Sequence, residues 1–388
     1  MKRSSILTIL AAAAVAASAQ TDGIIAAVKS QVAPDARQEV FEVTLADGVL
    51  RGKVSDMANL WILTDSLDAA GVEYVDSVEV FGYDSWALVR IPVATLRTRP
   101  AHSAEVATQA VMGTPVRVLE TTDEWMRVQT PDHYIAWVPD SSVSPRDSES
   151  LLEWQSDSTR LTVITMTEPR AYADPTGTSP RDVVSQLVLN AVVEAVPDTP
   201  VTNGRRMIKL PDGQTAWADA EVFQPITEWA SQPFDAERIM LTAHTMMGSP
   251  YLWGGTSSKS VDCSGLVKIS YLSNGIILLR DASQQARTGH QLDPEDIGAM
   301  EKGDLLFFGN RETGRVTHVA IYDSDGMFIH SSGLVRRNSL DRESPLYLYS
   351  PLSATRIYDS MDDENIRPVS ESWYFAAQPA TEIIIVED

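Results

Sequence analysis

The pattern of apolar and polar positions divides the chain into segments, and the first is a small mixed unit. Alternation over Gln38–Leu45 and Val49–Val54 predicts two strands joined by a hairpin turn. Apolar residues recur with helical spacing over Met57–Ala69, and Val75–Phe81 returns to a strand pattern. Residues 20–84 are therefore expected to form a small α/β module.

Two stretches of short apolar runs follow, and they are similar to each other. The first spans residues 85–145 and ends on His133-Tyr134-Ile135-Ala136-Trp137-Val138, whereas the second spans residues 150–228 and ends on Gln214-Thr215-Ala216-Trp217-Ala218. Short strands broken by turn residues predict a small β-barrel for each. The pair resembles bacterial SH3-like domains, and the Pro/Asp/Ser-rich Pro139–Ser150 is interpreted as the linker between them.

The remaining residues, 233–388, mix helices and strands and are expected to form one domain. Asp235–Met247 has the pattern of a helix with Asp235 near its N-cap, and a second helix is predicted to begin at or beside Cys263. Lys302–Gly309 predicts a turn and a strand, and an alternating pair of strands follows it. The whole chain is thus predicted to be a multidomain α+β protein.

Length and charge limit the possible functions. A chain of 388 residues is too long for one ordinary core and implies two to four domains. Its formal net charge of −22 argues against nucleic acid or an anionic membrane surface as a partner. A neutral or cationic ligand stays compatible with this charge.

The N-terminus has the pattern of a secretory signal peptide over residues 1–19. Lys2 and Arg3 precede the apolar run Ile6–Ala17, and Ala17-Ser18-Ala19 supplies a small-residue cleavage site. The run is too short for a permanent membrane span. We expect an exported protein, periplasmic or secreted, that begins near Gln20 and has no integral membrane segment.

Cys263 is the only cysteine of the chain, so it cannot form an intrachain disulfide. It is a buried small hydrophobe, an intermolecular link or a reactive thiol. A helix N-terminus stabilises a thiolate and is expected to lower the pKa of the thiol. Gly254 and Gly255 would let backbone N–H groups approach the sulfur and stabilise an oxyanion.

A thiol nucleophile needs a base, and two of the six histidines fall within one predicted hairpin. His318 alternates with Val319 and Ile321 and is expected to face away from the core. A three-residue loop at Asp323–Asp325, with Tyr322 opposite Gly326, would place His318 directly across from His330. Two solvent-exposed strand histidines are the other interpretation.

These motifs resemble those of the NlpC/P60 family of cell-wall cysteine peptidases. The resemblance rests on "SPYLWGG", "DCSG", "GDLLFF", "THVAIY" and "FIH", in the order typical of the family, and covers the chain from Phe234 onward. It implies a papain-like fold with Cys263 as nucleophile, His318 as general base and His330 as the polar residue that orients it. It also implies that Tyr251 assists the oxyanion, although a plain core tyrosine is the competing interpretation.

With two SH3-like domains, the chain is similar to the γ-D-glutamyl-L-diamino acid endopeptidases of the dipeptidyl-peptidase VI, or YkfC-like, type. These enzymes cut stem peptides that carry a free N-terminal L-Ala, whose ammonium is held by acidic and hydroxyl groups. The resemblance carries this role to Asp262, Ser264 and Ser283, and to Glu105 and Tyr134 in the first SH3-like domain. Glu105 could equally be a solvated surface acid, and Tyr134 a barrel-closing aromatic.

The predicted reaction is acyl transfer through Cys263, with peptidoglycan-derived peptides as substrates. No H-E-x-x-H motif or clustered Asp/His set is present in the sequence, so neither a metal nor another cofactor is expected. We expect a monomer. The alternatives are an endopeptidase that acts on intact peptidoglycan and a non-catalytic cell-wall binding protein.

Overall fold

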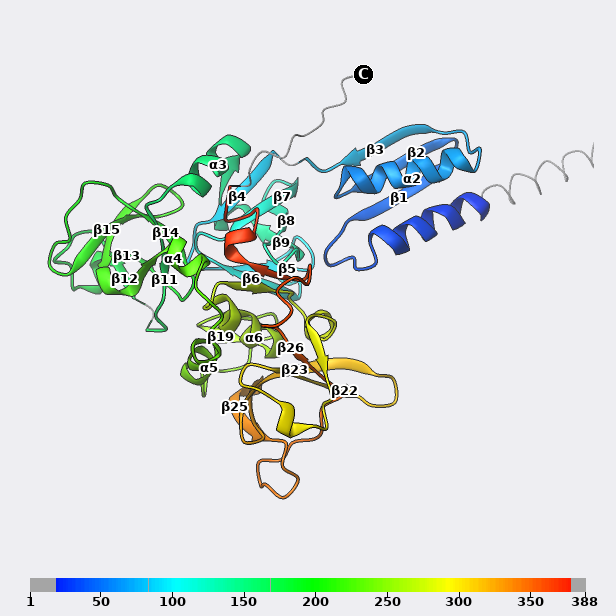
Figure 1. The fold of residues 1–388 in the computed structure, drawn as a ribbon. Helices are drawn as coiled ribbons and strands as arrows, with labels where there is room; N and C mark the ends of the chain where they lie inside the picture. The colour runs from blue at the N-terminus through cyan, green and yellow to red at the C-terminus, as the bar shows by residue number, and fades with distance from the viewer. Residues whose placement is uncertain (1–18, 83, 168, 378–388) are drawn as a thin grey trace, which may run out of the picture. The chain divides into compact units, whose positions relative to one another are not determined.

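The computed structural model describes residues 19–82, 84–167 and 169–377, which form two compact units, residues 1–84 and residues 85–388 (Figure 1). The predicted signal peptide, residues 1–19, lies almost wholly outside the described residues. Within the described ranges no helix combines the length and the apolar character that a membrane crossing requires.

The first unit is a three-stranded sheet of order β1-β2-β3. Strands β1 and β2 pair antiparallel, with Ala46 opposite Val49, and β3 pairs parallel to β2 after the α2 crossover. Asp56 caps α2 by accepting a hydrogen bond from the Ala58 N–H. Residues 19–32 are also helical. The named elements are β1 Phe41–Ala46, β2 Val49–Val54, α2 Met57–Ala69 and β3 Val75–Val80.

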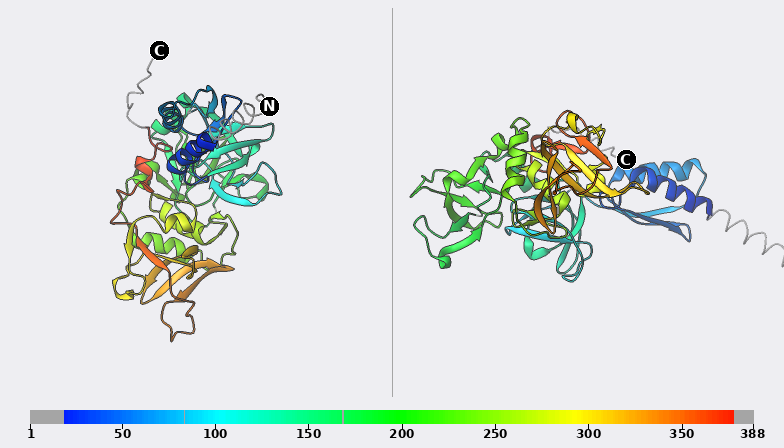
Figure 2. Two further views of the ribbon diagram at one scale, coloured as in Figure 1. Left: turned by 90° about the vertical axis from the view of Figure 1, so that its right-hand side faces the viewer. Right: turned by 90° about the horizontal axis from the view of Figure 1, so that it is seen from below.

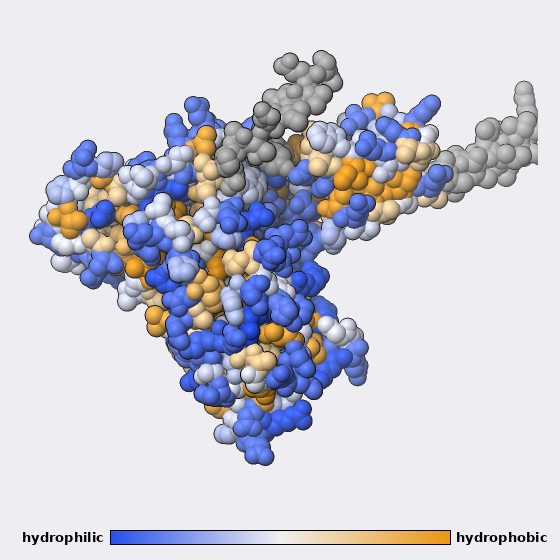
Figure 3. Space-filling view, in the orientation of Figure 1, coloured by the Kyte–Doolittle hydropathy of each residue, from blue (hydrophilic) through white to orange (hydrophobic). Residues whose placement is uncertain are grey.

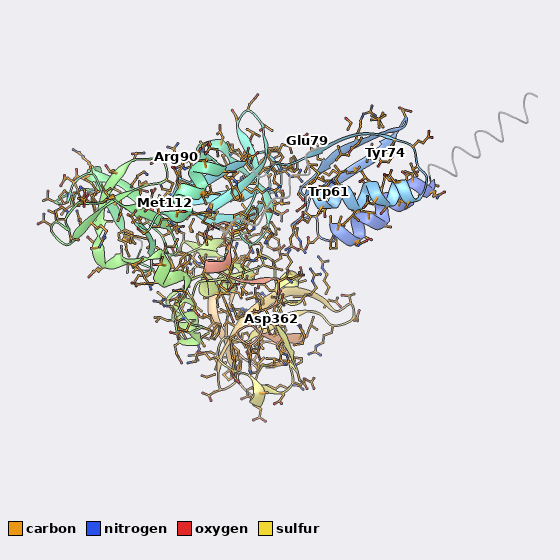
Figure 4. The ribbon with its side chains drawn as sticks, turned by 45° about the horizontal axis from the view of Figure 1, so that its top comes forward. Trp61, Tyr74, Glu79, Arg90, Met112 and Asp362 are labelled. Atoms are coloured by element: carbon orange, nitrogen blue, oxygen red, sulfur yellow. The ribbon has the colours of Figure 1, made fainter. Side chains whose placement is uncertain are left out.

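Apolar side chains gather on the surface of this first unit (Figure 3). Trp61 of α2, labelled in Figure 4, is 62% exposed, and Met57 on the same helix is also exposed. The opposite side of α2 is buried through Leu60, Leu63 and Leu67. The helix therefore fills the core of the unit with one side and leaves an aromatic side chain on the other.

The second unit begins with two β-domains that share one topology. The first, Ser85–Asp147, has strand order β10-β4-β7-β8-β9-β5-β6, and the second, Arg160–Pro225, has order β13-β12-β16-β15-β14-β11-β17. Equivalent strands follow the same order when the second sheet is read from its other end. The repeat that the sequence predicts is therefore present in the fold.

The two β-domains contain these elements: β4 Ser85–Val89, β5 Val93–Arg97, β6 Val106–Val111, β7 Pro115–Thr121, β8 Trp125–Gln129, β9 Ile135–Pro139, η1 Asp140–Ser142, β10 Val143–Asp147, β11 Arg160–Val163, β12 Arg170–Tyr172, η2 Pro180–Asp182, β13 Val183–Gln186, β14 Val192–Ala195, β15 Arg205–Lys209, β16 Thr215–Asp219, η3 Ala220–Val222 and β17 Phe223–Pro225. Helix α3 Ser148–Ser156 follows the first domain and α4 Ile226–Ala230 follows the second.

The segment Pro139–Ser150, interpreted as the linker between the two domains, instead contains β10, a strand of the first domain. Strand β10 within this segment pairs antiparallel with β4, from Val143 opposite Val89 to Asp147 opposite Ser85. Asp147 then caps α3 in a capping box with Ser150. Proline and serine occur here because β10 is the end strand of its sheet, where a missing N–H donor is tolerated.

The C-terminal part contains a six-stranded sheet of order β21-β26-β22-β23-β24-β25, and helices α5 and α6 lie beside it (Figure 2). One apolar cluster joins α6 to the sheet through residues such as Leu266, Val319 and Ile329. The elements are α5 Ala236–Thr245, β18 Thr256–Ser257, β19 Ser260–Val261, α6 Cys263–Leu272, β20 Ile276–Leu278, α7 Ala282–Gln285, β21 His290–Leu292, η4 Ile297–Ala299, β22 Leu305–Asn310, β23 Arg315–Ser324, β24 Met327–Ser332, β25 Leu334–Ser339, β26 Ser353–Arg356, β27 Ile366–Pro368 and η5 Val369–Glu371.

Specific contacts join the three parts of the second unit. Met112 of the first β-domain is fully buried in the apolar cluster of the second, and Arg90 pairs with Asp212 at 3.4 Å (Figure 4). Near the C-terminus, Tyr374 is fully buried and donates a hydrogen bond to the Gln129 side chain of the first β-domain. Arg160 of the second β-domain donates to the Phe375 carbonyl. The C-terminal segment therefore ties both β-domains to the rest of the unit.

Candidate active site

Cys263 is the first residue of α6, where the sequence predicts the helix to begin. Asp262 is the N-cap, and its Oδ1 accepts a 2.7 Å hydrogen bond from the Gly265 N–H. A Cβ on Gly265 would lie 1.9 Å from the Gly255 carbonyl oxygen, so only glycine lets the helix start against the preceding loop. Asp262 and Gly265 of the D-C-S-G motif thus both shape the start of the helix.

The pKa of the Cys263 thiol is shifted in the direction opposite to the one expected from the sequence. Burial and the adjacent Asp262 carboxylate raise the pKa of Cys263 to about 11, although hydrogen bonds from the backbone of Val319 and Ser264 act to lower it. The prediction of a lowered thiol pKa is therefore wrong, because burial outweighs the helix N-terminus. The resting group at neutral pH is a thiol, and a base must remove its proton.

The two hairpin histidines meet, but not in the predicted register. Tyr322 pairs with Phe328 rather than with Gly326, and the register shifts between Tyr322 and Ser324. His318 and His330 therefore sit diagonally, with His318 Nε2 2.7 Å from His330 Nδ1. Ala320 and Tyr322, on the histidine face of β23, belong to a second apolar cluster, so both faces of this strand are buried.

A chain of hydrogen bonds continues from the histidines to Asn338, which the sequence analysis missed. The Asn338 Nδ2 donates to the Leu346 carbonyl, so its Oδ1 faces His330 Nε2 at 2.8 Å. This arrangement places the proton of neutral His330 on Nε2 and leaves Nδ1 to accept from His318 Nε2–H. The remaining lone pair of His318 is then on Nδ1. No local sequence signal points to Asn338, because its role depends on strand pairing.

The base is neutral at ordinary pH. Burial, helped by His330 and Arg336, lowers the pKa of His318 to about 4. Cys263 and Val319, the residue that follows His318, belong to one buried apolar cluster, and the Val319 backbone acts to lower the pKa of Cys263. A neutral thiol beside a neutral imidazole can react by proton transfer during attack on a carbonyl.

Two tyrosines lie near the thiol. Burial, followed by the neighbouring Cys263 and Asp262, raises the pKa of Tyr251 well above its usual range, so Tyr251 keeps its proton as a hydrogen-bond donor. Burial and Cys263 also raise the pKa of Tyr349, whose ring packs edge-on against Phe308 at 5.1 Å. Tyr349 was not among the predicted site residues.

Asp262 and Ser264 are both bound to Arg280, a fully buried residue that the sequence analysis also missed. Arg280 donates to both oxygens of Asp262, at 3.2 and 2.6 Å, and to Ser264 Oγ at 2.9 Å. Its Nε donates to Thr108 Oγ1 of the first β-domain. The side chains of Asp262 and Ser264 are thus held in place from two domains.

The first β-domain also reaches the site through Tyr134. Its hydroxyl donates a 3.2 Å hydrogen bond to Asp281 Oδ2, next to Arg280. Glu105 is exposed and directly precedes β6, whose first residue, Val106, contacts Gly254. Ser283 is half-buried in α7, two residues after Asp281. Asp281 could have been noted from its charge after the apolar run Ile276–Leu279.

In the described parts of the chain, no group of three or more His, Cys, Asp or Glu side chains is arranged to hold a metal ion.

Comparison with protein families finds two matches. Residues 248–349 match the NlpC/P60 family, and residues 96–143 match the bacterial dipeptidyl-peptidase SH3 domain. The first range includes Cys263, His318, His330 and Asn338.

Curated proteins with similar sequences cover most of this chain. A γ-D-glutamyl-L-lysine dipeptidyl-peptidase of Bacillus cereus is 27% identical over 288 residues, 71% of this chain and 80% of the relative. Dipeptidyl-peptidase 6 of Lysinibacillus sphaericus is 28% identical over 272 residues, 67% of this chain and 94% of the relative. The crystal structure of an NlpC/P60 family protein from Bacillus cereus has the same fold, with a TM-score of 0.59 at 24% identity over 70% of this chain and 99% of that one.

Proposed function

We propose that this chain, which carries an NlpC/P60 cysteine peptidase domain behind a bacterial dipeptidyl-peptidase SH3 domain, hydrolyses the γ-D-glutamyl–L-diamino acid bond of peptidoglycan stem peptides. The observation that carries the proposal is the His318–His330–Asn338 hydrogen-bond chain, which starts on β23, a strand that packs in one apolar cluster with the buried Cys263 of α6. The names of the relatives from Bacillus cereus and Lysinibacillus sphaericus support this substrate class.

In the proposed reaction His318 Nδ1 takes the Cys263 proton as the sulfur attacks the γ-glutamyl carbonyl. The C–S bond forms and the carbonyl electrons move to oxygen, where backbone N–H groups and the Tyr251 hydroxyl stabilise the oxyanion. The oxyanion collapses, the C–N bond breaks and His318 returns the proton to the departing amine. Water, activated by His318, then hydrolyses the thioester.

The amine end of the substrate is proposed to bind between the first β-domain and α7. Asp281, which is partly buried, and Tyr134 lie together there, and Glu105 adds an exposed carboxylate just before β6. A buried ammonium needs such acceptors. Ser283 is half-buried on α7 and supplies a further hydroxyl, whereas Asp262 and Ser264 act through Arg280 to shape the pocket.

The test compares L-Ala-γ-D-Glu-diaminopimelate with the same peptide acetylated on its amine, using the purified mature protein. We expect cleavage of the free-amine peptide only, and none by Cys263→Ala. Equal cleavage of both peptides would favour an endopeptidase that acts on intact peptidoglycan. No cleavage of either would favour a cell-wall binding protein without activity.

The place of action is also a proposal. The basic start, apolar run and Ala17-Ser18-Ala19 support export, followed by cleavage before Gln20. N-terminal sequencing of the protein recovered from outside the cytoplasm checks this. Recovery only from the cytoplasm with Met1 intact would contradict it.

A further inference from the structure

Arg336 lies beside the candidate site, on β25. It pairs directly with His330 across strands β24 and β25. Residues directly opposite each other in an antiparallel pair project from the same face of the sheet. The Arg336 side chain therefore projects from the face that carries the histidines, and the residue is exposed.

The charge of Arg336 has no ion-pair partner among the residues that the structure describes. Among the described residues, no carboxylate lies within ion-pair distance of Arg336 and no hydrogen-bond partner is present. The adjacent Arg337 projects from the other face and donates to Asp323 Oδ2 at 3.3 Å. In a protein with a net charge of −22, an arginine that faces the site without a carboxylate partner is available for an anionic ligand.

The positive charge of Arg336 affects the pKa values of nearby groups in the site. After burial, which is the larger cause, the Arg336 cation lowers the pKa of both His318 and His330. It also opposes the raised pKa of Tyr349, which burial and Cys263 cause. An anion bound to Arg336 would thus lie next to the catalytic histidines.

The position of Arg336 indicates which part of the substrate it meets. The proposed amine-binding groups, Tyr134 and Asp281, come from the first β-domain and from the segment before α7. Arg336 comes instead from the strand next to the histidines. Because His318 must reach the departing nitrogen to protonate it, the leaving diamino acid lies on the histidine side.

We propose that Arg336 binds a free carboxylate of the leaving diamino acid and so makes the enzyme prefer stem peptides that carry this carboxylate. The proposal rests on the proposed function and adds a substrate-binding residue to it. A guanidinium can hold a carboxylate through two parallel hydrogen bonds, which lysine cannot do. Such a carboxylate is the α-carboxylate of a tripeptide or the side-chain carboxylate of diaminopimelate.

The experiment measures kcat/KM for four peptides with the full mature protein. The peptides are L-Ala-γ-D-Glu-L-Lys, its C-terminal amide, L-Ala-γ-D-Glu-diaminopimelate with only its α-carboxylate amidated, and L-Ala-γ-D-isoglutaminyl-L-Lys. The variants are Arg336→Gln, Arg336→Lys and, as the matched control, Arg337→Gln. We expect Arg336→Gln to lower kcat/KM about tenfold for L-Ala-γ-D-Glu-L-Lys and to have little effect on its amide.

The amidated peptides separate the possible carboxylates. If Arg336→Gln also slows cleavage of the α-amidated diaminopimelate peptide, Arg336 binds the side-chain carboxylate as well. Arg337→Gln should leave the acid-to-amide ratio unchanged, and Arg336→Lys should keep only part of the preference.

Three results would overturn the proposal. Arg336→Gln could have no effect on any peptide, or could slow all four equally. Alternatively, Arg336→Gln could lower kcat/KM for every peptide except the isoglutaminyl peptide. That result would assign Arg336 to the D-Glu carboxylate. Failure of the wild-type protein to cleave any peptide would instead overturn the proposed function itself.

Discussion

Cys263 and His318 are the residues whose protonation controls the proposed chemistry. Burial raises the pKa of the thiol to about 11 and lowers the pKa of the imidazole to about 4. Between these values both groups are neutral, so the ion pair typical of many cysteine peptidases is not the resting state. In the proposed reaction the proton moves during attack, as it does in serine hydrolases.

The first prediction concerns the pH dependence of activity. His318 acts as a base only when neutral, and its folded pKa of about 4 lies below the ordinary value of 6.5. We expect kcat/KM to stay high on the acid side and to fall as the pH falls through about 4. A pH profile of peptide cleavage measures this, in a range where circular dichroism shows the protein folded. An acid limb near 6.5 would contradict the lowered pKa.

The lowered pKa of His318 also makes the free energy of unfolding depend on pH. Between pH 6.5 and about 4 the unfolded chain binds a proton at His318 that the folded chain does not bind. The contribution of His318 to the free energy of unfolding is therefore present above pH 6.5 and is lost as the pH falls toward 4. His318→Gln should flatten this part of the stability profile.

The second prediction concerns Asn338 as a positioning residue. Its Oδ1 accepts from His330 and fixes the tautomer of both histidines. Asn338→Ala should lower kcat about tenfold with little change in KM, because the base loses its orientation. Asn338→Asp should raise the pKa of the histidine pair and move the acid limb of kcat/KM upward by about one unit. If both variants shared the wild-type pH profile and kcat, Asn338 would be merely structural.

Among the elements, the start of α6 and the β23–β24 hairpin position the site. The helix start follows from local chemistry, namely an N-cap aspartate and a glycine at a close backbone approach. The geometry of the hairpin does not follow from local chemistry, because a register shift near its turn makes the pairing between the histidines diagonal. Strand alternation places both histidines on one face, whereas turn geometry decides their spacing.

The third prediction tests the glycine loop before Cys263. Gly254 has φ +79°, and a Cβ there would lie 2.5 Å from Val106 Cγ1 and 2.7 Å from the Val106 carbonyl oxygen. Gly254→Ala should therefore cost about 2–4 kcal/mol of unfolding free energy, from strained backbone and overpacking together. It should also reduce activity, because the loop is pushed away from the first β-domain.

Gly248 provides the matched control for this loop. It has φ +84°, but a Cβ there would meet nothing within 4 Å. Gly248→Ala should cost only the backbone strain, about 1–2 kcal/mol. Urea unfolding measures both variants, and equal losses would show that the Val106 contact does not matter.

For the second unit as a whole, polar contacts hold the first β-domain against the catalytic part. Gln109 of β6 exchanges hydrogen bonds with Thr256 and accepts one from Ser257. Lys268 of α6 forms a buried ion pair with Asp132 of the first β-domain. These contacts hold the first β-domain, which carries Tyr134, against the part of the unit that carries Cys263.

The fourth prediction concerns this ion pair. Lys268→Met should lower the free energy of unfolding by about 3–5 kcal/mol, because Asp132 is left buried and without its cation. The double variant Lys268→Met with Asp132→Asn should recover part of the loss. Urea unfolding followed by tryptophan fluorescence measures both. Equal losses in the single and double variants would show that the pair does not account for the effect.

The sequence by itself determined most of the elements and pointed to the residues that are proposed to react. Periodicity predicts α2 and the repeated β-domains, and the motifs around Cys263, His318 and His330 identify the NlpC/P60 domain, because these signals are local in the chain. The tertiary structure decided the features that depend on contacts between residues far apart in the chain. Arg280, Asn338 and Arg336 acquire their positions from strand pairing and domain contacts between distant residues. Burial then reversed the expected thiol pKa, because desolvation depends on the whole packed environment and not on the helix start.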